Sequence, residues 1–131
     1  HLTLTYLVRA DKLCLQRFAA QGQPFAAKAP AVPTVPVGAD YTSDTHPNWA
    51  DLCRTRATPD VAIKSWLGEL PPQLVLAPMR YSNMKEVLRE HPAWQALSHF
   101  FKHQTHHRGQ LTTLLAQANV EAGVTDLIAL V

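Results

Sequence analysis

The sequence lacks strong net charge, long apolar runs and any visible targeting segment. Its 131 residues carry 12 Lys and Arg against 10 Asp and Glu, a formal net charge of +2. This disfavours nucleic-acid binding, which requires a concentrated basic face. No apolar run exceeds five residues, whereas about 20 are needed to span a bilayer, and no signal peptide is recognisable. We therefore predict a soluble, cytoplasmic protein that binds neither nucleic acid nor a membrane.

Cysteine is also scarce, and the two residues present have no functional spacing. Cys14 and Cys53 form no C-x-x-C pair, and two cysteines in a chain this long do not make a disulfide framework. We expect two reduced, mostly buried thiols. One alternative stays open: Cys14 could face the histidines near the end of the chain and form a nucleophile pair, which requires a depressed thiol pKa and some exposure. Motifs of serine hydrolases, P-loops and dinucleotide-binding proteins do not occur.

The remaining composition predicts one mostly helical domain spanning residues 1–131. Hydrophobic residues make up 47% and charged residues 17% of the chain, which excludes a disordered chain, and the length suits a single domain. Apolar residues at helical spacing predict one helix from about Leu2 to Ala20 and a long one from Pro92 to about Ala118, which ends at Asn119. A short helix is expected near Leu127.

Prolines divide the middle of the chain. Residues 21–47 contain five of them and predict a long crossover connection rather than regular structure. A second helical region begins near Asn48, where Pro59 permits two interpretations. Either a new helix is capped by Thr58 and runs to about Leu67, or one long helix is kinked at the proline. Residues 73–81 suit a short edge strand or hairpin arm.

Histidines are concentrated near the end of the chain, where five of the seven lie between His91 and His107. His103 and His107 are four residues apart, so on a helix their imidazoles project from one face and can converge on one cation. Neutral imidazole suits zinc, nickel, copper or iron, and a third ligand must come from another helix. The alternative is a polar seam of histidines, hydrogen-bonded across a bundle or exposed.

Two residues that follow the histidines also permit two interpretations each. Gln110 is either a hydrogen-bond partner of a ligating imidazole or an ordinary surface side chain. Gly109 costs about 1 kcal/mol in a helix, which close approach of another helix would explain, as would chance.

The end of the chain also resembles a known family. The stretch HFFKHQTHHRGQ, residues 99–110, with LTTLLAQ (111–117) and the tail GVTDLI (123–128), closely resembles the last helix of the DinB family. These are bacterial four-helix-bundle proteins, often dimeric, many with a divalent-metal site. Residues 4–18 resemble the second helix of that family, and residues 49–81 its third helix and short strand region. The resemblance implies an all-α, DinB-like four-helix bundle with a long crossover loop. The first helix of that bundle has no counterpart in residues 1–131, so we expect either that it precedes residue 1 or that a partner supplies it by dimerisation or domain swapping.

The resemblance further implies a metal site on named residues. His103 and His107 match the two ligands on the last helix of the family. Tyr6, five residues before Asp11, stands where the family has its third ligand, a histidine. The implied cofactor is a divalent metal, zinc or nickel. Tyrosine can ligate as phenolate, as in some iron sites, but it is a poor substitute in a zinc or nickel triad.

Two functions follow from this resemblance. The first is a metal-dependent enzyme of the thiol-transferase or hydrolase kind, since some relatives transfer thiols to small electrophiles. Its partner would be a small-molecule thiol or electrophile, and its catalytic residues stay unassigned. The alternative is a metal-free dimeric interaction or structural module that has lost the ion together with its third ligand. A homodimer is expected in either case.

Overall fold

Helices dominate the computed structural model, which describes residues 1–22 and 48–130. The long helices are α1 (Leu2–Ala19), α2 (Trp49–Glu69) and α3 (Ala93–Gln117), and the strands are β1 (Pro78–Ser82) and β2 (Leu88–Pro92). Short 3-10 helices lie before the strands (Pro72–Leu76) and near the end of the chain (Leu127–Leu130). The mostly helical class is confirmed, but the described residues hold three long helices and a small sheet rather than four helices alone. The predicted crossover covers residues 21–47, and residues 23–47 of it lie outside the described part of the chain.

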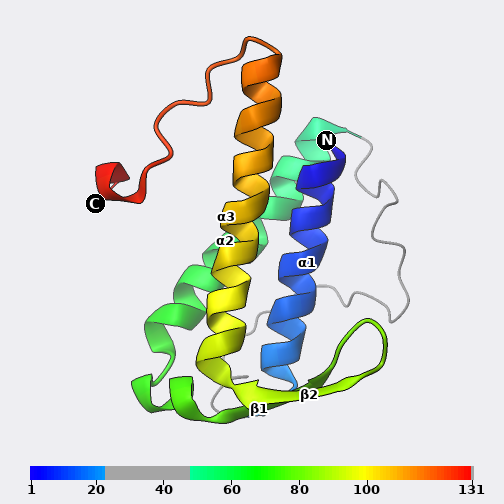
Figure 1. Cartoon of the computed structure of the whole chain (residues 1–131), viewed down its shortest axis with the longest axis vertical. Coiled ribbons are helices and arrows are strands. Elements are labelled where there is room, and N and C mark those ends of the chain that lie inside the picture. Colours follow the sequence, from blue (N-terminus) through cyan, green and yellow to red (C-terminus); the bar gives the residue numbers. More distant parts are fainter. Residues whose placement is uncertain (23–47, 131) are drawn as a thin grey trace.

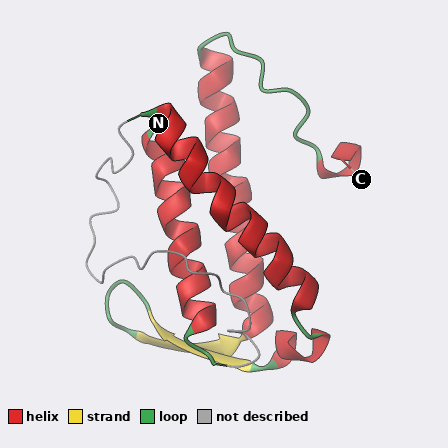
Figure 2. Ribbon diagram, turned by 180° about the vertical axis from the view of Figure 1, so that it is seen from behind, coloured by secondary structure: helices red, strands yellow, loops and turns green. Residues whose placement is uncertain are grey.

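The three helices form an open bundle closed at one end by the hairpin. Helices α1 and α2 begin at the same end and run in the same direction, and α3 returns antiparallel to them (Figure 1). Helix α1 contacts both α2 and α3, while α2 is inclined to the other two when seen from behind (Figure 2). Strands β1 and β2 both contact α3. Within the part of the chain described, no helix combines the length and apolar character needed to cross a membrane.

A single helix runs through Pro59. Asn48 caps α2, because its side-chain oxygen accepts a hydrogen bond from the backbone N–H of Asp51 at 2.8 Å, as N-cap residues commonly do. One long helix is therefore confirmed, and the alternative cap at Thr58 is wrong. Proline removes one helical hydrogen bond. Here the ring is almost fully buried, so its packing offsets part of that loss.

The hairpin places two strands side by side where the sequence predicted one. Strand β1 confirms the second half of the predicted arm, whereas the first half lies in the 3-10 helix Pro72–Leu76. Strand β1 pairs antiparallel with β2, and Arg80 lies opposite Glu90. These two side chains form an ion pair with a nitrogen–oxygen distance of 2.8 Å, a cross-strand contact that supports the register. Strand β2 was not predicted because its residues, LREHP, show no alternation of apolar and polar side chains.

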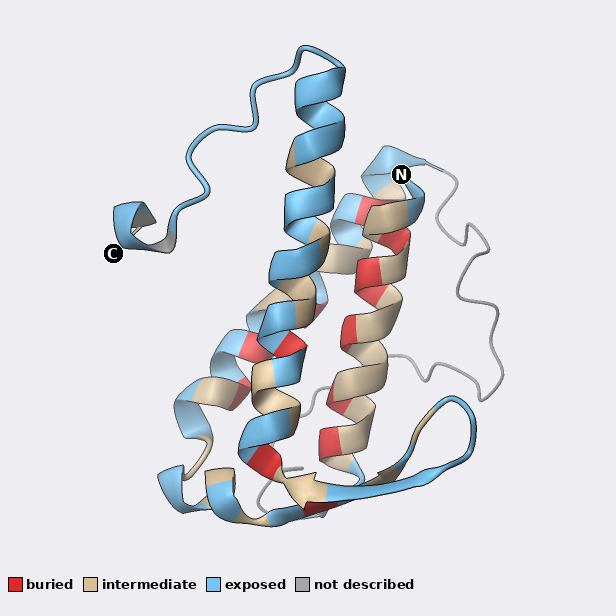
Figure 3. Cartoon of the chain, viewed as in Figure 1, coloured by how far each residue is buried: buried red, intermediate tan, exposed pale blue. Residues whose placement is uncertain are grey.

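The core gathers at the hairpin end of the bundle. Its buried members are Leu15, Phe18, Ile63, Trp66, Met79, Ala93 and Phe100. The Phe18 and Trp66 rings lie 4.8 Å apart between centroids, within the range of favourable aromatic pairs. Helix α3 is buried only at Ala93 and Phe100, and its far half is mostly exposed (Figure 3). The bundle is therefore tightly packed at one end and open at the other.

Helix α3 ends at Gln117, and Asn119, the predicted end, lies just beyond its C-cap residue Ala118. Asn119 has a φ of +56°, the left-handed conformation that asparagine tolerates better than most residues. The backbone N–H of Val120 donates to Leu115 O at 2.9 Å, and that of Asn119 donates to Ala116 O at 3.0 Å. This is the Schellman pattern of helix ends. The short helix expected near Leu127 is present as a 3-10 turn.

Gly109 lies inside α3 with open space around it. A Cβ at this position would meet no atom of the described residues within 4 Å, so close approach of a described helix does not explain the glycine. We expect Gly109→Ala to stabilise the protein by about 1 kcal/mol, because glycine loses more backbone entropy than alanine in a helix. Urea unfolding of the two proteins measures the difference. A variant no more stable than the parent would contradict the expectation.

Candidate metal centre

The contact between α1 and α3 brings Tyr6, His103 and His107 together. The Nε2 atoms of His103 and His107 lie 3.2 Å apart, because the two residues are one helical turn apart on the same face of α3. The hydroxyl of Tyr6, from α1, lies 3.4 Å from His103 Nε2. The Tyr6 ring also contacts the His107 ring, with centroids 4.9 Å apart. All three residues predicted for the site therefore share one location.

The hydrogen bond to Gln110 indicates which nitrogen atom of His107 carries the proton. Gln110 Oε1 lies 2.7 Å from His107 Nδ1; an amide oxygen only accepts, so Nδ1 carries the proton and a neutral His107 has its lone pair on Nε2. Its Nε2 can then accept a hydrogen bond from a protonated Nε2 of His103, 3.2 Å away, and the Tyr6 hydroxyl can accept from or donate to His103 according to its tautomer. When His103 carries its proton on Nδ1 instead, the lone pairs of both Nε2 atoms face the space between the rings. In that tautomer the two nitrogen atoms can share one cation, either a proton or a metal ion.

The donor spacing matches that of ligands on one ion. Two ligands each about 2.1 Å from a metal lie about 3.0 Å apart at a right angle and about 3.4 Å apart at a tetrahedral angle. The His103–His107 and Tyr6–His103 distances, 3.2 and 3.4 Å, fall in this range. Three donors on one ion leave at least one coordination position for water or substrate.

The environment of His103 favours the neutral form of its imidazole. Burial lowers the pKa of His103, and the neighbouring His107 and His99 lower it further, whereas Asp11 opposes the shift. A neutral imidazole is the form that binds metal. Gln110 was predicted to be either a partner of a ligating imidazole or a surface side chain. It is exposed, and it hydrogen-bonds the His107 imidazole and also lies 3.2 Å from His106 Nε2.

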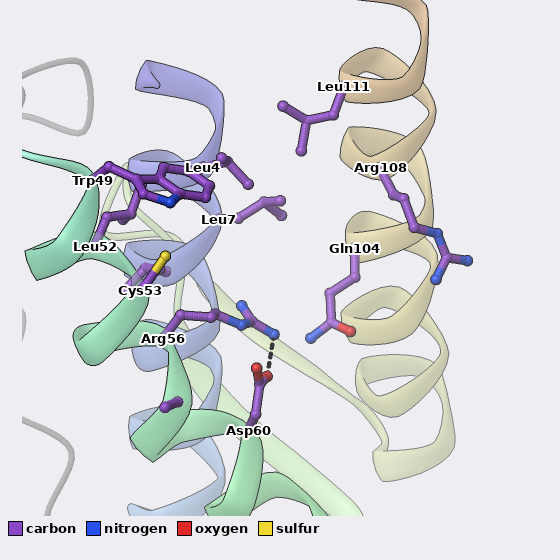
Figure 4. Close-up of a pocket in the computed structure, with 12 residues that line it drawn as sticks. Leu4, Leu7, Trp49, Leu52, Cys53, Arg56, Asp60, Gln104, Arg108 and Leu111 are labelled. Carbon is purple, nitrogen blue, oxygen red and sulfur yellow. Dashed lines mark ion pairs between the residues drawn. The ribbon is translucent and has the colours of Figure 1, made fainter. Parts of the chain in front are cut away.

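The two cysteines lie outside this cluster. Cys14 is half-buried beside the core, and burial raises the pKa of its thiol to about 11, so it lacks the depressed pKa of a nucleophile. Cys53 is exposed, and the prediction of a buried thiol is wrong for it. It lies on the wall of the cavity at the open end of the bundle, where no other side chain of the described residues covers it (Figure 4).

A buried ion pair connects α1 to α2 next to the cluster. The Asp11 carboxylate accepts from the Arg56 guanidinium, which also pairs with Asp60 at 2.6 Å. Asp11 is 1% exposed and Arg56 is 31% exposed. Burial raises the pKa of Asp11, while Arg56 and Gln104 lower it. Asp11 falls on the stripe of Leu7, Leu15 and Phe18; a charge among these apolar residues was a sequence signal of the ion pair.

The open end of the bundle contains a cavity of about 530 Å³ between the three helices. Its walls are largely apolar, with Leu4, Leu7, Leu52 and Leu111 among them, and Arg56, Asp60 and Gln104 lie on its floor. Figure 4 shows Gln104 and Leu111 extending from α3 toward the other two helices, whereas the Arg108 guanidinium points away. Tyr6, His103 and His107 do not line it, so the cavity and the metal-site cluster are separate.

Among the described residues, no group of three or more His, Cys, Asp or Glu side chains has the arrangement of a metal site. The cluster on α1 and α3 contains two histidines, and its third member is a tyrosine. Any ion held there must therefore take a phenol oxygen as its third protein ligand or bind through the two imidazoles and water alone.

Comparison with known proteins identifies one family. Residues 41–130 match the family model described as the DinB family, which covers more than half of the chain and includes both histidines of the cluster. No curated protein and no solved structure matches the chain significantly.

Proposed function

Because the chain belongs to the DinB family, we propose that it binds one transition-metal ion between α1 and α3 through His103, His107 and Tyr6. The observation that carries this proposal is the pair of Nε2 atoms 3.2 Å apart, with the Nδ1 atom of His107 engaged by Gln110. With His103 protonated on Nδ1, this arrangement directs both ring lone pairs to one point. The family resemblance supports a metal at this position, and the donor spacing supports the same assignment.

The activity class we propose is that of a metal-dependent thiol transferase or hydrolase. When bound, the ion supplies a Lewis-acid centre that makes water or a thiol more acidic. The chain's own residues position the site: Gln110 orients His107, and the contact with α3 holds the Tyr6 ring. Helix α3 is mostly exposed beyond the core, so a small substrate can reach the cluster.

Calorimetric titration tests the metal-binding proposal. Chelator-treated protein is expected to bind one zinc or nickel ion per chain, with the release of heat and of any proton shared by the two imidazoles. Binding of several ions per chain with similar weak affinity would indicate scattered surface histidines. That result, or no binding at all, would refute the proposed site.

Gln110 provides a more specific prediction. We expect Gln110→Ala to weaken metal affinity about 10-fold, because an outer partner of a ligating histidine fixes its orientation and typically contributes 10–100-fold. The matched control is Gln95→Ala, which removes an exposed glutamine from the same helix. Calorimetry of both variants measures the difference. Equal affinities in the two variants would show that Gln110 does not orient the ligand.

A second candidate is the dimeric interaction module. The open end of the bundle favours it, since Leu2 and Trp49 are exposed there beside the cavity and apolar surface of this kind is typical of protein interfaces. We propose a second copy of the chain as the occupant. Sedimentation velocity is expected to show a dimer that Trp49→Glu converts to monomer. A monomeric parent protein at all concentrations would rule out this candidate.

A further inference from the structure

The third donor of the cluster is a phenol oxygen. Tyr6 is half-buried on α1, and its ring lies 4.9 Å from the His107 ring and 5.6 Å from the His103 ring, centroid to centroid. These contacts hold the ring in place. Its hydroxyl lies 3.4 Å from His103 Nε2, and that nitrogen lies 3.2 Å from His107 Nε2, so the oxygen is close to the pair of imidazole nitrogens. This position makes Tyr6 the candidate for a third ligand.

Tyr6 is also the donor that determines the charge of the site. The two imidazoles bind as neutral ligands, and no group of three or more His, Cys, Asp or Glu in the described residues offers an alternative ligand set. A bound phenolate contributes one negative charge. Because Coulomb attraction grows with the charge of the cation, an anionic oxygen favours a trivalent ion more strongly than a neutral imidazole would.

We propose that Tyr6 makes this site selective for ferric iron over zinc and nickel; the inference presupposes the metal-binding function proposed above. Zinc in proteins is held mainly by nitrogen, sulfur and carboxylate oxygen, whereas tyrosine oxygen serves as an iron ligand in a class of haem proteins. On binding, the phenol loses its proton to solvent and its oxygen forms the bond to iron. No electron is transferred, because iron enters in the ferric state.

Visible absorption spectroscopy tests this assignment directly. Chelator-treated protein is loaded with ferric nitrilotriacetate, and a phenolate-to-iron charge-transfer band is expected in the visible range. Tyr6→Phe is expected to lose the band, and its ferric affinity to fall by more than about 100-fold, beyond the range for an outer partner of a ligand. In competition between the ferric chelate and zinc, the parent protein is expected to take up iron.

Two further variants separate ligation from folding. Tyr81→Phe is the matched control, since the Tyr81 hydroxyl lies 3.2 Å from a single imidazole nitrogen, that of His91; its band and affinity are expected to equal those of the parent. Tyr6→His keeps a ring and a donor in place, and is expected to lose the band and to prefer zinc. Circular dichroism confirms that each variant is folded, and the competition on the parent protein needs no variant.

The outcomes distinguish this inference from the function on which it rests. A protein that binds zinc through His103 and His107 but does not prefer iron would overturn the ferric assignment and leave the metal site standing. A charge-transfer band that persists in Tyr6→Phe would overturn it as well, because another oxygen would be the ligand. Failure to bind any of the three metals would overturn both.

Discussion

His103→Ala and His107→Ala are each expected to weaken metal binding by more than about 100-fold. Each substitution removes one of the two imidazoles whose Nε2 atoms lie 3.2 Å apart, and losing a direct ligand costs more than the 10–100-fold typical of an outer partner. The measurement is a calorimetric or competitive chelator titration of each variant with zinc. Because the histidines are only half-buried, both variants are expected to keep the helical content of the parent.

His99→Ala is the matched control for these two variants. His99 lies one turn before His103 on α3 and its ring contacts that of His103 at 5.7 Å between centroids, but it is exposed and lies away from the shared point. Its removal is expected to leave metal affinity within about twofold of the parent, as for an exposed side chain that is not itself a ligand. Equal losses in all three variants would indicate a diffuse histidine patch rather than a site.

Arg56→Met is expected to lower the free energy of unfolding by about 3 kcal/mol at pH 7. Removing one partner of a buried ion pair leaves the other charge uncompensated and typically costs 3–5 kcal/mol; the partial exposure of Arg56, 31%, argues for the lower end. Asp11, at 1% exposure, would keep a buried charge without its cation. Urea unfolding measures the loss. Arg54→Met, which breaks an exposed pair with Asp51, is the control and should cost less than about 1 kcal/mol.

The cost of Arg56→Met is expected to shrink in acid. Burial raises the pKa of Asp11, whereas the neighbouring Arg56 guanidinium lowers it. Removing Arg56 therefore raises the pKa of Asp11 further. A carboxyl whose pKa is higher in the folded than in the unfolded protein binds more protons when folded, and stability then increases as pH falls through that range. The variant should recover stability from pH 7 toward pH 4 more than the parent does. An equal loss at both values would show that the pair contributes only through packing.

Local pattern predicted much of the architecture. The helical spacing of apolar residues led to α1 and α3, and Asn119 identified the end of α3, because periodicity and helix-end chemistry depend only on nearby residues. The i, i+4 spacing likewise placed the His103 and His107 rings side by side. Tyr6 could be joined to them only through the family resemblance, since a contact between α1 and α3 leaves no periodic signal in either segment.

The features that sequence reasoning missed depend on tertiary packing. Whether Pro59 starts a helix or lies within one is decided by the burial of its ring, which no local rule reports. Strand β2 exists because β1 pairs with it, although its own residues carry no strand pattern. The Asp11–Arg56 pair joins two helices far apart in the sequence, and only Asp11, a charge on an apolar stripe, hinted at it.

The central claim is that three side chains from α1 and α3 share one ion, and a crystal structure of the zinc-loaded protein tests it most directly. Anomalous scattering should locate one zinc within about 2.0–2.3 Å of His103 Nε2 and His107 Nε2, with the Tyr6 oxygen beside it. The opposite result is an ion elsewhere, or none, with the two imidazoles joined by a proton. That finding would contradict the account and leave a DinB-family bundle with a hydrogen-bonded histidine pair.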